Sequence, residues 1–399
     1  MRKTLTGIAV AGLVMALTAC GGQAKSTGPN IHSNYGATVG IAMPTRTSPR
    51  WIADGNNMVQ QFSEMGYKVN LQFADNDVKK QVGQVQSMIG GGDKLLVIAA
   101  VDGSSMTSVL STAAQKKIPV IAYDRLLTGT KDVDYQATFD NLRVGTMQGS
   151  LLVQRLGLVS SKADQHKIGG VGSKAATPTT KAAATVAPIA PAGAVAAKGP
   201  FNVELFAGSP TDNNSKFFYQ GAMAVLKPYI KSGKIVIRSG EQELKQITTT
   251  NWDGVVAGTR MQKILTQDYQ RSTVNAILSP YDGMSIGIIK VLLANGYGTS
   301  VKPLPIISGQ DAELPSVKSI IAGQQTGTIY KDTRELAKVA VQMGNALLTG
   351  VTPKVNDTTS FNNGVKIVPT YLLPPINIDK NNYKTLLVGG GYYTAAQLA

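Results

Sequence analysis

The sequence contains few side chains suited to redox, metal or acid–base chemistry. Its 399 residues include one cysteine, Cys20, and only two histidines, His32 and His166. A lone cysteine excludes an intramolecular disulfide. Both histidines lie in polar or low-complexity stretches, outside any strand or helix pattern, which argues against histidine catalysis and a histidine metal site. We therefore expect no metal, no cofactor and no enzymatic activity.

The chain also lacks an apolar run as long as the roughly 20 residues that cross a bilayer. Residues 1–20 combine two basic residues with a shorter apolar run and end in "LTAC", which is typical of a secretion signal. The order Leu-Thr-Ala-Cys resembles a bacterial lipobox, so we expect Cys20 to carry a lipid anchor. A free cysteine near an ordinary cleavage site is the alternative. The polar, Gly/Ser-containing residues 21–35 predict a flexible tether, and the predicted location is extracytoplasmic, anchored to the cell membrane.

Acidic residues are scarce relative to basic ones. The 24 Asp and Glu face 39 Lys and Arg, for a formal net charge of +15. Nucleic acid would be one partner for such a charge, but the export signal and the absence of a basic helix with interleaved aromatics argue against it. A basic surface beside anionic lipid or cell wall fits better. We expect no nucleic-acid partner and a monomeric protein.

Strand and helix patterns alternate along the rest of the chain. The first series has strand-like runs separated by helical spacing at 58–66, 78–89 and 106–117. Its expected strands are 37–44, 68–74, 94–101, 118–124 and 135–140. A second series begins at residue 201 and continues to residue 330. Such alternation predicts parallel sheets with right-handed helical crossovers, arranged as two similar α/β lobes.

Between the two series lies a segment, residues 160–200, that is rich in Ala, Pro, Thr, Gly and Lys. It offers little apolar surface to bury, which predicts disorder or a surface loop. Because it follows a helical pattern at 144–157, we interpret it as an excursion inside the second lobe. Its "GGVGSK" lacks the spacing and the preceding strand of a phosphate-binding loop.

Polar and aromatic residues recur where the expected strands end. In open parallel sheets ligands bind beyond the carboxyl ends of the strands. The residues at these ends are Arg50, Trp51, Asp102, Asp124, Arg125, Asp140, Asn141, Asp212, Asn213, Asn214, Asp282, Gln310, Asp311 and Lys331. For any single Asp or Asn, a helix N-cap is the alternative. The repetition in both series favours a ligand site.

The chemistry of this set suits a polyol. Charged and amide side chains supply the paired donors and acceptors that hydroxyl groups need. Trp51 and Trp252, the only tryptophans, fall one in each lobe and could sandwich a pyranose ring; both could instead be core residues. A carboxylate pair such as Asp124 and Asp140 could in principle serve glycoside hydrolysis. A clamp that binds hydroxyl groups is the simpler hypothesis.

Several motifs together resemble a known family. The runs "SPRWIADGNNMV", "VIAYDRLL", "ATFDN", "GSPTDNNSKFF", "SPYDGMSIG", "SGQDAELPSVKSIIAGQQTGTIYKDTRELAK" and "KIVPTYLLPP" are similar to the solute-binding receptors of bacterial sugar ABC transporters. Among these, the xylose-binding and multiple-sugar-binding (glucose/galactose) receptors are the most similar. The resemblance spans residue 36 to the end, apart from the excursion.

That resemblance implies a type I periplasmic-binding fold, in which two Rossmann-like lobes joined by three crossovers close on a monosaccharide. It implies a first lobe of residues 36–142 plus about 332–362, and a second lobe of 143–331 plus about 363–399. It further implies a permease of the ABC type as partner and xylose, glucose or galactose as ligand. The sugar contacts that it implies are Arg50, Trp51, Asp124, Arg125, Asp140, Asn141, Asn213, Asn214, Trp252, Asp282, Asp311 and Lys331.

Three alternatives use a related fold or a similar ligand. A chemoreceptor or sensor-kinase subunit would use the same sugar site and differ only in its partner. A sugar-responsive repressor needs an N-terminal helix-turn-helix, where this chain has its signal and tether. An exported glycosidase would hydrolyse an aryl glycoside, which a binding protein leaves intact.

Overall fold

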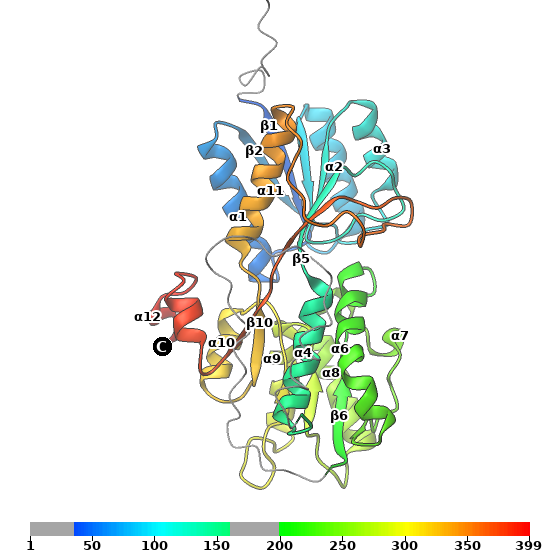
Figure 1. The fold of residues 1–399 in the computed structure, drawn as a ribbon, viewed down its shortest axis with the longest axis vertical. Helices are drawn as coiled ribbons and strands as arrows, with labels where there is room; N and C mark the ends of the chain where they lie inside the picture. The colour runs from blue at the N-terminus through cyan, green and yellow to red at the C-terminus, as the bar shows by residue number, and fades with distance from the viewer. Residues whose placement is uncertain (1–35, 160–198) are drawn as a thin grey trace, which may run out of the picture.

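The structure is a computed structural model that describes residues 36–159 and 199–399. These residues form two α/β lobes placed end to end along the long axis of the molecule (Figure 1). The predicted signal at 1–20, the tether at 21–35 and nearly all of the 160–200 excursion lie outside the described residues, as do Cys20 and both histidines. Among the described helices, none has the length and apolar character needed to cross a membrane.

The first lobe is built on a six-stranded parallel sheet with strand order β11-β5-β4-β3-β1-β2. Its strands are β1 (Thr38–Met43), β2 (Lys68–Phe73), β3 (Leu95–Ile98), β4 (Val120–Tyr123), β5 (Tyr135–Phe139) and β11 (Thr370–Leu373). Its helices are α1 (Pro49–Glu64), α2 (Val78–Gly91), α3 (Thr107–Gln115) and α11 (Thr333–Leu348). Two separate apolar clusters pack on the sheet, and for this reason β3, "LLVI", is apolar and fully buried along its length.

Local sequence explains where these helices begin and end. Asp77 caps α2 by accepting a hydrogen bond from the Lys80 backbone N–H, and Gly92 ends that helix in the left-handed conformation. Helix α1 begins earlier than its apolar spacing predicts, because Pro49 stands at its first position. Arg50 and Trp51 therefore lie in the first turn of a helix.

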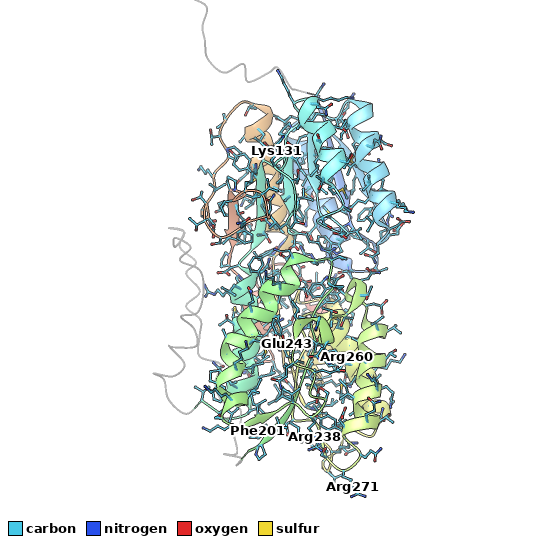
Figure 2. All side chains as sticks on the ribbon, turned by 90° about the vertical axis from the view of Figure 1, so that its right-hand side faces the viewer. Lys131, Phe201, Arg238, Glu243, Arg260 and Arg271 are labelled. Atoms are coloured by element: carbon cyan, nitrogen blue, oxygen red, sulfur yellow. The ribbon has the colours of Figure 1, made fainter. Side chains whose placement is uncertain are left out.

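The second lobe repeats this arrangement on a smaller sheet. Strands β7, β6, β8 and β9 form a parallel four-stranded sheet, and β10 pairs with β12 antiparallel. The strands are β6 (Phe201–Leu205), β7 (Ile235–Val236), β8 (Ala276–Leu278), β9 (Ile306–Ile307), β10 (Gly327–Tyr330) and β12 (Ile376–Asp379). The helices are α4 (Asn141–Arg155), α6 (Asn213–Lys231), α7 (Leu244–Ile247), α8 (Gly254–Asp268), α9 (Asp282–Ala294), α10 (Leu314–Ile321) and α12 (Ala395–Leu398). Figure 2 shows Phe201 at the end of this lobe remote from the first lobe, so β6 runs toward the junction.

The described chain crosses between the lobes at three places. These are the links from β5 to α4, from β10 to α11 and from β11 to β12. The predicted α/β class, with parallel sheets in two lobes, is thus confirmed. The predicted return to the second lobe near residue 362 is too early: β11 pairs with β5 in the sheet of the first lobe, so the chain leaves that lobe only after Leu373.

Two glycines allow α4 and α6 to pack closely beside the junction. A Cβ atom on Gly145 would overlap the backbone of Phe218, and one on Gly221 would overlap the carbonyl oxygen of Leu142. Both overlaps involve backbone atoms, which cannot rotate away as a side chain would. The position of α6 relative to α4 therefore depends on these two residues.

We expect Gly145→Ala to lower the free energy of unfolding by about 1–3 kcal/mol, because the added methyl group forces the helices apart. The measurement is thermal unfolding of the purified protein. Gly83→Ala is the matched control, since Gly83 is an exposed residue of α2 and a methyl group added there would meet no heavy atom within 4 Å. That control should raise stability by about 0.5–1 kcal/mol. Equal stability of both variants would contradict the packing argument.

Candidate functional site

A cavity of about 420 Å³ lies between the two lobes. Its size is within the range of small-molecule sites. The first lobe contributes residues that follow β1, β2 and β4, and the second lobe contributes the starts of α6, α8 and α9 and the segments after β9 and β10. The cavity is therefore found where the strand-end rule predicts a ligand.

Arg50 is the centre of a buried ionic network in this cavity. Its Nη2 lies 2.9 Å from Asp54 Oδ2, and its Nη1 lies 3.1 Å from Asp124 Oδ2 and 3.6 Å from Asp311 Oδ1. Lys331 Nζ lies 3.1 Å from the same Asp311 oxygen and 3.8 Å from Asp124 Oδ2. All five side chains are at least nine-tenths buried. Two cations and three carboxylates from both lobes thus meet in one place.

Burial and mutual pairing shift the pKa values of this network in opposite directions. Burial alone lowers the pKa of Arg50, but Asp124, Asp54 and Asp311 outweigh it and raise that pKa well above its usual value. Burial raises the pKa of Asp124, yet Arg50 and Lys331 bring it below its usual value. For Asp54 burial dominates and raises the pKa to about 6. Asp124 is therefore a firmly ionised acceptor at the cavity.

Further contacts link the lobes across the cavity. Arg125 Nε, from the first lobe, lies 2.9 Å from Asp212 Oδ2 of the second. Asn214 Nδ2, in the first turn of α6, donates to Asp124 Oδ1 at 3.0 Å. Hydrogen bonds to ionised groups are short and strong. The two walls are thus held in register by charged and amide side chains.

Trp51 lines the cavity but is only 4% exposed. The guanidinium carbons of Arg50 and Arg125 lie 4.3 and 5.0 Å from its ring centroid. Its ring also belongs to the apolar core of the first lobe. Trp51 is therefore both a residue of the cavity wall and a residue of the apolar core.

Trp252, on the opposite wall, is half-buried and also lines the cavity. Its Nε1 donates to Asp212 Oδ2 at 3.2 Å, and its ring meets Phe218 and Tyr281 edge to face at 6.0 and 6.2 Å. A Cβ atom on Gly208 would overlap the Trp252 ring. Gly208 therefore lets the ring lie against the end of β6.

Unusual backbone conformations concentrate at the cavity. Eight described non-glycine residues have positive φ, and five of them line the cavity: Asn76, Asp124, Asn251, Trp252 and Asp311. Such conformations cost about 1–3 kcal/mol each and persist where the surrounding structure enforces them. Their concentration here supports the cavity as the candidate functional site.

Eight of the predicted contact residues line the cavity: Arg50, Trp51, Asp124, Arg125, Asn214, Trp252, Asp311 and Lys331. The other four do not. Asp140 is the N-cap of α4 and accepts from the Arg143 backbone, so the capping alternative holds for it. Asn141 lies behind the cavity and donates to Asn214 Oδ1 at 2.8 Å.

The remaining two are also displaced from the cavity wall. Asn213 is a half-buried residue of α6, beside the wall residue Asn214. Asp282 is fully buried and accepts from Gln325 Nε2, Thr328 Oγ1 and the Glu313 backbone at 2.9–3.0 Å. Burial raises its pKa well above the usual value, and its role is to support the segment that carries Glu313.

Some residues of the cavity wall are absent from the predicted set of contacts. Among them are Ser48, Asp212, Phe218, Tyr281, Gln310 and Glu313, to which the buried partner Asp54 can be added. Two signals were present in the sequence: Asp212 and Gln310 follow strands, and Asp54 lies four residues after Arg50 on one helix face. The remaining residues, Ser48, Phe218, Tyr281 and Glu313, reach the cavity wall through the packing of distant parts of the chain, which no local sequence pattern specifies.

Comparisons with known proteins agree with this architecture. A model of the periplasmic binding protein domain matches residues 39–352. The multiple sugar-binding periplasmic receptor ChvE of Rhizobium radiobacter is 49% identical, over 96% of this chain and 99% of the relative. The D-xylose-binding periplasmic protein of Escherichia coli is 33% identical, over 90% and 92%. A solute-binding protein of an ABC transporter from Clostridium phytofermentans, crystallised with β-D-glucose, superposes with a TM-score of 0.79 at 41% identity, covering 91% of this chain and 100% of that one.

The fold and the two-lobed cavity thus define a type I periplasmic binding protein, and the chain belongs to the periplasmic binding protein family. The resemblance to sugar-binding receptors of ABC transporters is confirmed. This family is not enzymatic, as the sequence predicts.

We expect Gly208→Ala to displace the Trp252 ring, because the new methyl group occupies the position of the indole. In a Trp51→Phe background, the fluorescence of Trp252 should then shift toward that of a solvent-exposed indole. Gly90→Ala in the same background is the control, since no heavy atom lies within 4 Å of a Cβ placed there. An unchanged emission spectrum in the Gly208 variant would show that the ring does not depend on this glycine.

Proposed function

We propose that the cavity binds one monosaccharide in its pyranose form, of the glucose, galactose or xylose type. The observation that carries the proposal is the buried set of ionised donors and acceptors, supplied by both lobes around one cavity. Each sugar hydroxyl both donates and accepts, so it can join a cation to a carboxylate. The named ligands of the relatives, multiple sugars, D-xylose and β-D-glucose, support the same ligand class.

The wall residues have three roles in this proposal. Arg50, Arg125 and Lys331 donate to ring and hydroxyl oxygens, whereas Asp124 and Asp311 accept from hydroxyl groups. Trp51 and Trp252 are the aromatic residues on opposite walls and pack against the C–H faces of the ring. Asn141, Asn213, Asp140 and Asp282 support or adjoin this wall and are not proposed as direct contacts.

Closure follows from the position of these groups on two lobes. A sugar that contacts both walls has more partners when the lobes are together, so binding favours the closed form by that difference. The three crossings between the lobes provide the hinge. We propose that the closed form is the one delivered to an ABC permease.

The lipid anchor belongs to the same proposal. The motif that ends in Cys20 supports diacylglycerol attachment at this cysteine, with residues 21–35 as the tether. An anchored receptor stays near a membrane permease, which raises its effective concentration there.

For the sugar site, we expect Asp124→Asn to weaken glucose or xylose binding by roughly 10- to 100-fold, because a charged acceptor becomes a neutral amide. Isothermal titration calorimetry of residues 21–399 measures this. Lys331→Met, which removes a donor from the same network, should also weaken binding.

Asp140→Ala is the matched control for these variants. It removes the cap of α4 and should lower stability by about 1 kcal/mol, while affinity stays within about twofold because Asp140 does not line the cavity. Wild-type affinity in both Asp124→Asn and Lys331→Met would refute the assignment of the site.

For the anchor, we expect Cys20→Ser to abolish incorporation of radiolabelled palmitate when the full chain is expressed in a bacterium. The protein should also move from the membrane fraction to the soluble extracytoplasmic fraction, since a serine cannot form the thioether. Gly22→Ala is the control and should remain labelled. Labelling that persists in Cys20→Ser would exclude this cysteine as the anchor.

A further inference from the structure

Three helices that start at the cavity wall begin with an N-cap residue whose side chain does not cap its own helix. They are α1, α9 and α10, and their N-caps are Ser48, Tyr281 and Glu313. Serine is among the favoured N-cap residues because its oxygen usually accepts a bond from the first turn. Here no side-chain cap hydrogen bond is formed at any of these three positions.

The three side chains instead bond to one another. Ser48 Oγ donates to Glu313 Oε1 at 3.0 Å, and Tyr281 OH donates to the same oxygen at 2.7 Å. Ser48 belongs to the first lobe, whereas Tyr281 and Glu313 belong to the second. All three side chains line the cavity. The bond from Ser48 to Glu313 can exist only while the lobes are together.

We propose that Ser48, Tyr281 and Glu313 form a latch that holds the lobes together over a bound sugar and sets the rate at which the sugar leaves. The inference rests on the proposed function and adds positioning residues that are not required as sugar contacts. Tyr281 orients the Glu313 carboxylate from within its own lobe, and Ser48 joins it on closure. Asp282 fixes the backbone of Glu313 by accepting from its N–H at 2.9 Å.

The surroundings of Glu313 give the latch a pH dependence. The other titratable groups that interact with it are Tyr281 and Asp282 of α9, Asp311 before α10, Arg50 of α1 and Tyr393 near the C-terminus. Burial raises the pKa of Glu313 to about 7, and the hydrogen bonds from Tyr281 and Ser48 only partly oppose this. When the lobes separate, the carboxyl is exposed and its pKa falls toward the ordinary 4.5.

The pKa values of Glu313 in the closed and open forms decide whether closure is favoured at low or at high pH. A group with a higher pKa in the closed form takes up a proton on closure, so closure is favoured at low pH and weakens as pH rises through about 7. Dissociation of a neutral sugar should therefore become faster between pH 6 and pH 8.5. Glu313→Gln mimics the protonated carboxyl and keeps an acceptor oxygen for Ser48, so its dissociation should not change in this way.

Stopped-flow dissociation of glucose or xylose, followed by tryptophan fluorescence, tests the latch. We expect Ser48→Ala to release sugar about tenfold faster, because one bond to a carboxylate is lost. Its Tm without sugar should match the wild type, since the Ser48 side chain makes no cap hydrogen bond and its bond to Glu313 is absent when the lobes are apart. Ser48→Thr, which keeps the hydroxyl, should restore slow release. Ser150→Ala is the matched control, because Ser150 donates to the Thr146 carbonyl within one helix.

Glu313 is tested by the pH profile of the same rate. Wild type should release sugar several-fold faster at pH 8.5 than at pH 6, and Glu313→Gln should remove most of that difference. Burial raises the pKa values of Asp54 and Asp212 in both proteins, and Glu313 does not act on either, whereas Asp282 is coupled to Glu313. The difference between the two profiles therefore belongs to Glu313 together with its coupling to Asp282. Unchanged release in Ser48→Ala, a Tm loss typical of a missing cap, or parallel pH profiles would overturn the latch. Sugar binding itself would survive these outcomes, whereas a wild type that binds no sugar would refute the proposed function and the latch together.

Discussion

The structure of the cavity depends on keeping the buried guanidinium of Arg50 paired. A buried charge without partners is strongly unfavourable, and removing one member of a buried pair leaves the other uncompensated. Arg50 meets this requirement with Asp54 on its own helix, Asp124 after β4 and Asp311 from the second lobe. A single side chain thereby connects α1, the sheet of the first lobe and the opposite wall. The backbone at Asp124 and Asp311 adopts positive φ, which turns both carboxylates toward this cation.

The same requirement links binding to closure. Arg50 and Asp124 lie in the first lobe, while Asp311 and Lys331 lie in the second, so the network is complete only when the lobes meet. Arg125 with Asp212, and Ser48 with Glu313, add interlobe contacts of the same kind. When the lobes separate, polar groups whose partners lie on the other lobe lose those partners and are exposed to water. A ligand rich in hydroxyl groups can bridge them, which explains why a polyol suits this cavity better than an apolar ligand.

Much of the fold could be predicted from the sequence, because buried parallel strands such as β3 are continuous apolar runs and most of the strands are followed by a helical pattern. The ends of helices and strands were harder to predict. Helix α1 begins at Pro49, ahead of its apolar spacing, and β11 joins the first sheet through pairing with β5, a contact that local sequence does not encode. Their position just after a strand correctly predicted that Asp124, Asp311 and Lys331 lie in the cavity. It could not separate them from Asp140, which follows a strand in the same way and caps a helix, nor identify Glu313, whose partner Ser48 is 265 residues away.

We expect one pyranose ring to occupy the cavity and to join the charged groups of both lobes. A crystal structure of residues 21–399 grown with saturating D-glucose or D-xylose tests it most directly. The electron density should show one sugar ring between Trp51 and Trp252, with hydroxyl groups within hydrogen-bond distance of Asp124, Asp311 and at least one of Arg50, Arg125 and Lys331. A sugar bound elsewhere, or a cavity in which these side chains pair only with one another while sugar is bound, would contradict it.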